Sequence, residues 1–179
     1  MGEGASPLLV AWLARLGEAA RLGPVADLAC GRGRHALAVA ARGIRTLGID
    51  RDARALSALR EAARAQGTPV LALRADLEAP QGIPLRRACC GAVLVFRFLF
   101  RPLAPEIEAV LAPGGLLVYE TFTIHQRNLG QGPRNEAFLL APGELRRLFP
   151  GLEILSSWEG VLAGPPPQAL ARLVARRPA

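Results

Sequence analysis

The sequence predicts an α/β domain built on an open, doubly wound sheet of seven mainly parallel strands, with an antiparallel strand pair at the C-terminal end. Short apolar segments typical of strands alternate with helix-like segments as far as residue 122, which is the pattern of a parallel sheet. The segment GAVLVF at 91–96 is apolar without alternation, as expected of a strand covered on both faces. Two further strand-like segments follow near the C-terminus.

The first part of the chain has clear start and stop signals. Ser6 and Pro7 occupy the N-cap and first position of a predicted helix that ends at Gly23. Asp52 opens a second strong helix, which Gly67 ends. The other elements expected here are strands at 24–29, 44–50 and 70–75, and a helix at 35–42 that ends at Gly43.

The second part begins with a loop or weak helix at 78–90. Pro113, Gly114 and Gly115 predict a turn before the fifth strand. The expected strands are 91–98, 116–121, 152–158 and 168–177, and the expected helices are 105–111 and 142–149. The last two strands are joined through the proline-rich stretch 164–167.

A chain of 179 residues predicts a single domain, 1–179. Its expected parts are an N-terminal helical cap (1–23), a ligand-binding core (24–122), a lid loop (123–141) and a C-terminal helix with strands (142–179). The longest apolar run, Leu8 to Ala14, is far shorter than the roughly 18–20 residues that cross a bilayer, so no membrane partner is expected. The N-terminus lacks a basic region followed by an apolar stretch, which disfavours a secretory signal and indicates a cytoplasmic protein.

Three cysteines without a CxxC pair disfavour both a disulfide framework and a zinc site, and no metal is expected. The 22 basic residues are all arginines and exceed the 15 acidic ones, giving a net charge of +7. Because the arginines are scattered, a compositional bias towards Arg, Ala, Leu, Gly and Pro explains them better than a nucleic-acid partner, which stays open but is not favoured.

The most informative segment is Asp27-Leu-Ala-Cys-Gly31-Arg-Gly33-Arg-His35, where a predicted strand enters a glycine turn that opens a helix. Gly31 and Gly33 allow a ligand to approach the backbone, and free N–H groups at a helix start attract an anion. Asp50 ends the second strand and is suited to bind ribose hydroxyls, although it is also a candidate helix cap. Asp76 follows the third strand, where a carboxylate is able to accept from an adenine amino group.

This glycine pattern also satisfies the dinucleotide fingerprint, so a nicotinamide cofactor is an alternative. Asp27 separates the two interpretations, because a carboxylate four residues before Gly31 repels a pyrophosphate and attracts a ligand that carries an ammonium or sulfonium group.

The chain resembles the class I S-adenosylmethionine-dependent methyltransferases, which have a Rossmann-like sheet. The matching pieces are DLACGRGRHAL (27–37), GID (48–50), RADLE (74–78), GAVLVF (91–96) and LAPGGLLVYETF (111–122). Within the class, CGRGRHAL, FLFRPL (98–103) and PRNEAFLLAPGELRRLF (133–149) are most similar to the tellurite-resistance-type enzymes. The tail after Trp158 departs from some members, so the resemblance does not carry over a substrate.

The resemblance implies S-adenosylmethionine as cofactor. It places Asp27 near the ammonium, the two glycines under the methionine part and ribose, and Phe96 near the reactive end. It gives Asp76 and the Leu77 backbone N–H to the adenine. The implied cofactor-binding residues are Asp27, Gly31, Gly33, Asp50, Arg51, Asp76, Leu77 and Phe96.

The function expected from these features is methyl transfer to a small, soft or anionic acceptor such as a thiol, a selenol or a metalloid oxyanion. Such acceptors are partly ionised near neutral pH, so the lack of an obvious catalytic dyad does not argue against an enzyme. Glu120, His125 and Arg134 are candidates for the substrate side. The alternatives are an RNA or protein methyltransferase, a nicotinamide-dependent oxidoreductase and a non-catalytic cofactor-binding protein. The sequence does not indicate an oligomeric state.

Overall fold

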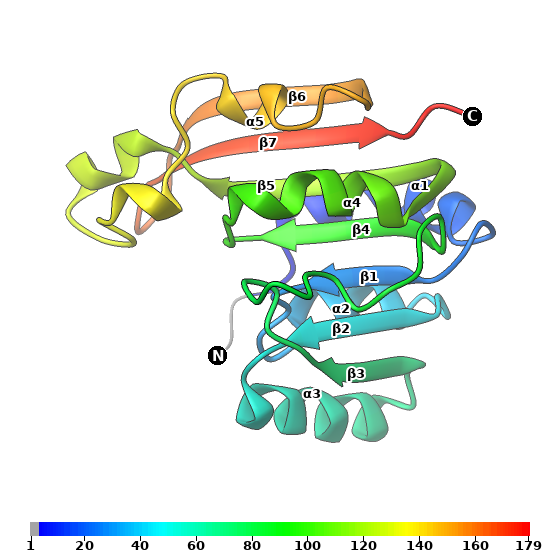
Figure 1. Cartoon of the computed structure of the whole chain (residues 1–179). Coiled ribbons are helices and arrows are strands. Elements are labelled where there is room, and N and C mark those ends of the chain that lie inside the picture. The colour runs from blue at the N-terminus through cyan, green and yellow to red at the C-terminus, as the bar shows by residue number, and fades with distance from the viewer. Residues whose placement is uncertain (1–3) are drawn as a thin grey trace.

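The computed structural model describes residues 4–179 and contains one seven-stranded sheet. The strand order is β3-β2-β1-β4-β5-β7-β6, as Figure 1 shows. The strands from β3 to β5 are parallel, whereas β7 runs antiparallel to both β5 and β6. The predicted fold class, including the antiparallel pair, is therefore confirmed. Residues 1–3 of the expected N-terminal cap lie outside the described residues.

The strands are β1 (Val25–Leu28), β2 (Thr46–Asp50), β3 (Val70–Arg74), β4 (Cys90–Phe96), β5 (Leu111–Phe122), β6 (Glu153–Leu162) and β7 (Gln168–Arg176). The α-helices are α1 (Pro7–Ala19), α2 (Arg34–Ala40), α3 (Ala53–Gln66), α4 (Ala104–Val110) and α5 (Glu144–Arg147). Residues 4–179 also contain three short 3-10 helices, at Arg101–Leu103, Ile124–Leu129 and Glu136–Phe138.

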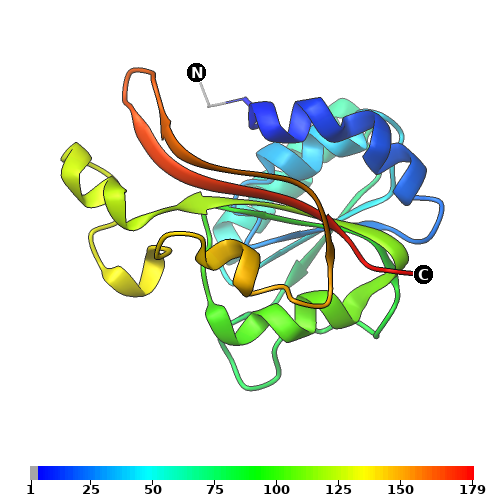
Figure 2. The ribbon, with the colours of Figure 1, turned by 90° about the horizontal axis from the view of Figure 1, so that it is seen from above.

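Helices cover both faces of the sheet, with α1, α2 and α3 on one face and α4 and α5 on the other (Figure 2). Strand β4 shows how the sequence produces two cores, because its neighbouring side chains point to opposite faces. Leu94 packs with Leu9 and Leu16 of α1, whereas Val93 packs with Ile107 of α4. All residues of β4 are buried, as its unbroken apolar sequence predicts.

The predicted capping roles of Ser6, Asp52 and Gly67 are confirmed. The Ser6 hydroxyl accepts a hydrogen bond from the Leu8 backbone N–H at the start of α1. Asp52 caps α3 by accepting from two backbone N–H groups, and Gly67 ends that helix in the left-handed region. Each of these capping contacts joins residues that are close in the sequence, so the helix ends are set by local sequence more than by tertiary packing.

Several boundaries differ from the prediction: α1 ends at Ala19 and not at Gly23, β6 continues to Leu162 and not 158, and two further differences have a clear cause. Pro113, Gly114 and Gly115 form an irregularity inside β5, which shifts register against β4, instead of a turn before a separate strand. The helix expected at 142–149 is reduced to α5, because Gly143 adopts a left-handed conformation and sets a late start. Within the described residues, none of the helices has the length and apolar character needed to cross a membrane.

Candidate functional site

The candidate site lies at the carboxyl edge of the sheet, where the strand order reverses. Strand β1 pairs in parallel with β2 on one side and with β4 on the other. In open α/β sheets, the crevice outside such a reversal point is where ligands bind. Two cavities of about 480 Å³ and 390 Å³ open here. We refer to them as the glycine-loop cavity and the Asp76 cavity; Asp27 borders the first, whereas Asp50 and Asp76 border the second.

Asp50 holds the glycine turn that follows β1. The Gly31 backbone N–H donates to Oδ2 of Asp50 at 2.7 Å, and the Asp52 backbone N–H donates to Oδ1 at 2.8 Å. Asp50 thus joins the end of β2 to the turn after β1, and it does not cap α3. Because a carboxylate oxygen accepts more than one hydrogen bond, Asp50 retains acceptor capacity for a ligand in the Asp76 cavity.

The two glycines of the turn have different surroundings, although both have a positive φ. A Cβ added to Gly31 meets no atom within 4 Å, and Gly31 borders the glycine-loop cavity. A Cβ added to Gly33 lies 2.2 Å from Cδ1 of the buried Leu59. The backbone at Gly31 is therefore open to a ligand, whereas Gly33 is required by the packing of the turn against α3.

Asp27 is the third residue of β1 and is buried, with 1% of its surface exposed. Burial raises its pKa to about 7, opposed by the hydrogen bond from the Ala36 backbone N–H and by the charge of Arg34. Near pH 7 the Asp27 carboxyl is therefore close to the midpoint of its titration. A positively charged group brought into the glycine-loop cavity will favour the ionised form.

His35, the second residue of α2, stacks on Phe96 at the end of β4 with ring centroids 3.8 Å apart. Burial lowers the pKa of His35 to about 3, with Arg34 and Arg97 acting in the same direction, so the ring is neutral. Its Nε2 is buried and has no hydrogen-bond partner among the described residues. Because both rings border the glycine-loop cavity, that cavity offers a neutral aromatic wall beside a buried carboxyl.

The Asp76 cavity is bordered by Asp50, Arg51, Asp76 and Leu77, which the sequence predicted to act together. Arg51 is exposed and lies 3.9 Å from Oδ1 of Asp76 and 3.3 Å from Oε2 of Glu78. The Leu77 side chain is buried, and within residues 4–179 its backbone N–H makes no hydrogen bond to the protein. This cavity therefore combines acceptors on Asp50 and Asp76 with a backbone donor on Leu77.

The two cavities meet at Ala29 and Arg97, each of which borders both. These residues follow the neighbouring strands β1 and β4 and adopt left-handed φ values of 52° and 57°. That conformation costs of order 1 kcal/mol for a residue with a Cβ, and such strain is concentrated at functional sites. Two of the three non-glycine residues with positive φ in the described part of the chain thus lie at the junction of the two cavities, which together form one elongated site.

A third cavity, of about 330 Å³, shares Arg34 and Arg97 with the glycine-loop cavity. We call it the Glu120 cavity. Glu120 is buried, accepts from the Ser6 hydroxyl at 3.0 Å and receives the Nε–H of Arg172 at 2.7 Å. The remaining lining is mainly small and apolar, from the start of the chain and the β6–β7 connection.

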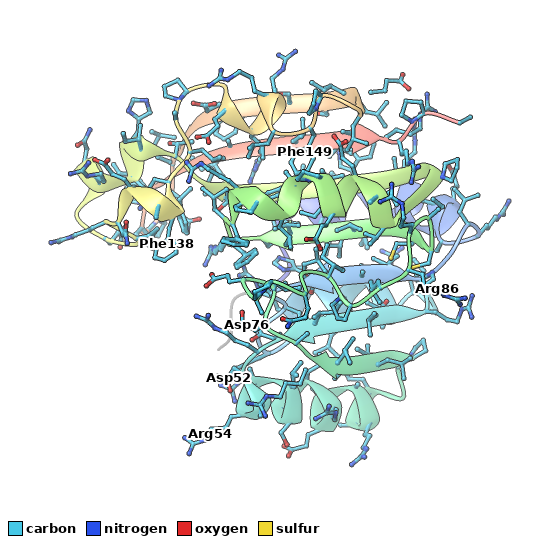
Figure 3. All side chains as sticks on the ribbon, viewed as in Figure 1. Asp52, Arg54, Asp76, Arg86, Phe138 and Phe149 are labelled. Carbon is cyan, nitrogen blue, oxygen red and sulfur yellow. The ribbon has the colours of Figure 1, made fainter. Side chains whose placement is uncertain are left out.

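The other two substrate-side candidates lie apart from these cavities. His125 and Arg134 are exposed, and neither borders the three cavities described above. The same segment instead contributes Pro133 and Phe138 to the Asp76 cavity. Figure 3 shows Phe138 and Asp76 at the same edge of the sheet.

Sequence reasoning missed several residues that border the cavities. Arg97 adopts a left-handed conformation that has no signal in the sequence. Arg172 and Ser6 reach Glu120 from 52 and 114 positions away, so only the folded sheet brings them together. Among these residues, only Arg34 could have been found from the sequence, because it directly follows Gly33 of the glycine turn.

Residues 25–115 match the protein family described as methyltransferase domain. This match covers half of the chain and contains the glycine turn, Asp50, Asp76 and the arginine at position 97. A comparison with curated protein sequences gave no significant match.

Solved structures share the fold at low sequence identity. An S-adenosylmethionine-dependent methyltransferase from Methanosarcina mazei is 17% identical with a TM-score of 0.74, covering 98% of this chain and 99% of that one. TehB from Haemophilus influenzae is 18% identical with a TM-score of 0.73, and the match covers 92% of this chain and 62% of TehB. A protein studied for the conversion of a disulfide bond into a thioacetal group during echinomycin biosynthesis is 22% identical, with a TM-score of 0.72 and coverages of 98% and 82%.

Proposed function

The chain belongs to the methyltransferase-domain family and is an S-adenosylmethionine-dependent enzyme, and from this premise we propose that it methylates a small, soft or anionic acceptor. The observation that carries the proposal is the joined pair of cavities at the sheet reversal point, where Asp50 of the Asp76 cavity accepts from the backbone N–H of Gly31 in the glycine-loop cavity. Family membership also decides against the nicotinamide-dependent alternative.

The residues of the Asp76 cavity fit the adenosine part of the cofactor. In this proposal Asp50 accepts hydrogen bonds from the ribose hydroxyls, with Arg51 beside it. Asp76 accepts from the adenine amino group, and the Leu77 backbone N–H donates to a ring nitrogen. The acceptors, the donor and the cavity are present without rearrangement of the chain, which supports this assignment.

The glycine-loop cavity fits the methionine part. The open space above Gly31 leaves room for a ligand against the backbone. Asp27 supplies the negative charge that an ammonium group needs, and its raised pKa shows that the cavity disfavours this charge when no cation is near. The Nε2 of His35, which has no hydrogen-bond partner among the described residues, is free to hydrogen-bond to the ligand. Phe96, which stacks on His35, lies at the reactive end of the proposed site.

When bound, S-adenosylmethionine supplies a methyl group that its sulfonium leaving group already activates. The protein then has to hold the acceptor in line with this carbon and exclude water from the site. A general base is required only for an acceptor that must lose a proton during transfer. A thiol, a selenol or a metalloid oxyanion is partly ionised near neutral pH, so none of the described side chains needs to act as a base for such acceptors.

The acceptor is assigned to the Glu120 cavity, because it adjoins the proposed methionine site through Arg34 and Arg97. Three arginines and one carboxylate border it, which suits an acceptor of negative charge. Glu120 is committed to Ser6 and Arg172, so its proposed contribution is to hold the Arg172 guanidinium at the cavity wall. The conversion of a disulfide bond into a thioacetal group, for which the structurally similar echinomycin-pathway protein was studied, is consistent with a soft acceptor.

A two-stage experiment tests the proposal. Thermal-shift measurements with S-adenosylhomocysteine, S-adenosylmethionine, NAD and NADP should show stabilisation by the first two alone. Methyl transfer is then measured with thiols, selenite and tellurite as small acceptors, and with RNA and protein as large ones. Stabilisation by NAD alone contradicts the cofactor assignment, and transfer to RNA or protein alone contradicts the acceptor class.

A further inference from the structure

We propose that Phe138 forms an aromatic wall over the adenine end of the cofactor site, and that Arg101 is the residue that positions it. The proposal rests on the proposed function, because the adenine is assigned to the Asp76 cavity there. It adds one residue that contacts the cofactor, Phe138, which lies outside the segment that matches the family, and one positioning residue, Arg101, which lies within that segment but far from its glycine turn.

Phe138 is a surface aromatic that the hydrophobic core does not use. Its relative exposure is 47%, whereas the next residue, Leu139, is 3% exposed and belongs to the core. Phe138 ends the 3-10 helix Glu136–Phe138 and borders the Asp76 cavity together with Asp76 and Leu77. A half-exposed ring at the wall of such a cavity gains burial and stacking when a purine enters.

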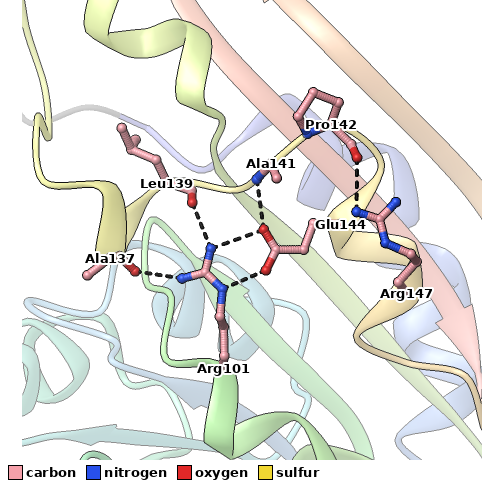
Figure 4. A network of polar contacts seen from close by, with 7 residues as sticks. All are labelled: Arg101, Ala137, Leu139, Ala141, Pro142, Glu144 and Arg147. Carbon is pink, nitrogen blue, oxygen red and sulfur yellow. Dashed lines mark hydrogen bonds and ion pairs between the residues drawn. The ribbon is translucent and has the colours of Figure 1, made fainter.

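One guanidinium group holds the backbone on both sides of Phe138. Nη1 of Arg101 donates to the carbonyl oxygen of Ala137 at 2.9 Å, and Nη2 donates to that of Leu139 at 2.8 Å (Figure 4). Two separate donors on neighbouring atoms of a planar group fix the orientation of the chain between these carbonyls. The backbone of Phe138 is therefore set by Arg101, while its side chain remains outside the core.

Glu144 fixes the Arg101 side chain in turn. Its carboxylate accepts from Nε and Nη2 of Arg101 and also from the Ala141 backbone N–H at 2.7 Å. Arg101 follows β4, and Glu144 begins α5, so the clamp connects the cofactor edge of the sheet with the C-terminal part of the chain. The hydrogen bonds and charge of Arg101 lower the pKa of Glu144, as expected of a committed ion pair.

Binding of S-adenosylhomocysteine to Phe138 variants tests the contact. Phe138→Ala should raise the dissociation constant about tenfold, the usual cost of losing one stacked ring. Phe138→Tyr should remain within about threefold of the wild type, since it keeps the ring. Ile124→Ala is the matched control, because Ile124 is an exposed apolar residue of the same segment that does not border the cavity. Phe138→Trp adds an optical readout, as its fluorescence should change when the ligand is added.

A double-mutant cycle tests the positioning role of Arg101. Arg101→Met should weaken binding several-fold in the wild-type background and have little further effect in Phe138→Ala, because both changes remove the same contact. Arg147→Met is the matched control: Arg147 donates to the Pro142 carbonyl in the same network but does not hold the chain at Phe138. A purely structural role for Arg101 predicts equal, additive losses in both backgrounds.

The outcomes separate this proposal from the proposed function. If the wild type binds S-adenosylhomocysteine and Phe138→Ala binds it equally well, with no optical response in Phe138→Trp, the aromatic wall is refuted and the proposed function stands. If Phe138→Ala loses affinity but Arg101→Met does so additively, the positioning role alone is refuted. If the wild type does not bind S-adenosylhomocysteine, both proposals fail.

Discussion

The carboxylate of Asp50 accepts a hydrogen bond from the backbone N–H of Gly31 at 2.7 Å, which ties the end of β2 to the turn after β1. These residues are 19 positions apart, and the parallel pairing of β1 with β2 brings them together. A residue proposed to bind ribose thereby also shapes the loop proposed to bind the methionine part. Changes at Asp50 should consequently affect the whole cofactor site.

Asp50→Ala should weaken the binding of S-adenosylhomocysteine by about 1.5–3 kcal/mol, the usual worth of hydrogen bonds to a charged group. Isothermal titration calorimetry measures the loss directly. Asp52→Ala provides the control, because Asp52 caps α3, lies two residues away and borders neither proposed cofactor cavity. It should lower the melting temperature and leave the affinity unchanged. Equal losses of affinity in the two variants would contradict the ribose role of Asp50.

The two glycines of the turn should respond differently to alanine. Gly31→Ala places a methyl group in open space beside the proposed ligand and adds only the backbone strain of its positive φ, about 1 kcal/mol, so it should reduce affinity more and stability less than Gly33→Ala does. Gly33→Ala drives a methyl group against Leu59, so it should mainly reduce the free energy of unfolding. Urea unfolding and titration calorimetry on each variant separate the effects.

A double variant tests whether overlap with Leu59 causes the loss of stability expected in Gly33→Ala. In Gly33→Ala/Leu59→Ala the overlap is removed, so the combined loss of stability should be smaller than the sum of the single losses. Strict additivity would show that Leu59 is not what excludes a side chain at Gly33.

Local signals made most of the fold predictable. Ser6, Asp52 and Gly67 mark helix ends through contacts within a few residues, and the apolar run of β4 identified a doubly covered strand. The irregularity at Gly114 in β5 was missed, because a Pro-Gly-Gly sequence is equally suited to a turn and to a bulge.

The sequence predicted only those site residues whose position in the chain, directly after a strand, places them at the carboxyl edge of the sheet. Asp50 and Asp76 stand directly after parallel strands, so their positions indicated a shared edge. Arg101 and Glu144 are 43 positions apart, and no periodic pattern relates them. In our proposal Arg101, held by Glu144, positions Phe138, so the sequence alone did not assign Phe138 to the site. The left-handed φ of Arg97 has no sequence signal, so Arg97 was not assigned either.

Asp27 should make the stability of the ligand-free protein dependent on pH. Its pKa is about 7 in the folded protein and 3.8 in the unfolded chain, so folding favours the protonated form. This stabilisation is complete below about pH 4 and is lost as the pH rises to 7. Asp27→Asn lacks the titrating group, so its stability relative to the wild type should increase between pH 4.5 and pH 7.5. Urea unfolding of both proteins at the two pH values measures the change.

His35 acts in the opposite direction and must be accounted for. Its pKa is lowered to about 3, so its contribution to stability is present above about pH 6.5 and is lost as the pH falls. Because His35 is present in both proteins, its effect cancels in the difference between wild type and Asp27→Asn. A difference that stays constant with pH would show that Asp27 is ionised throughout in the folded protein.

Residues 123–141 remain predicted to form a lid over the substrate side, and the structure narrows which part is able to move. Leu139 and Leu140 are buried, and the Arg101 clamp holds the far end. At the near end, the Gln126 side chain is buried and accepts from the Ala169 backbone N–H at 2.8 Å. The section between these anchors contains Gly130 and Gly132, both with positive φ.

Hydrogen exchange should therefore show the largest change within residues 129–135 when S-adenosylhomocysteine and an acceptor are added together, with little change at the anchored ends. Gln126→Ala should speed exchange of the section in the ligand-free protein, because it releases the near anchor from β7. Arg134→Ala should reduce turnover more than cofactor affinity, since Arg134 is exposed and borders none of the cavities until the section closes. Identical exchange in both states, together with normal turnover by Arg134→Ala on every accepted substrate, would show that the segment is an ordinary surface loop.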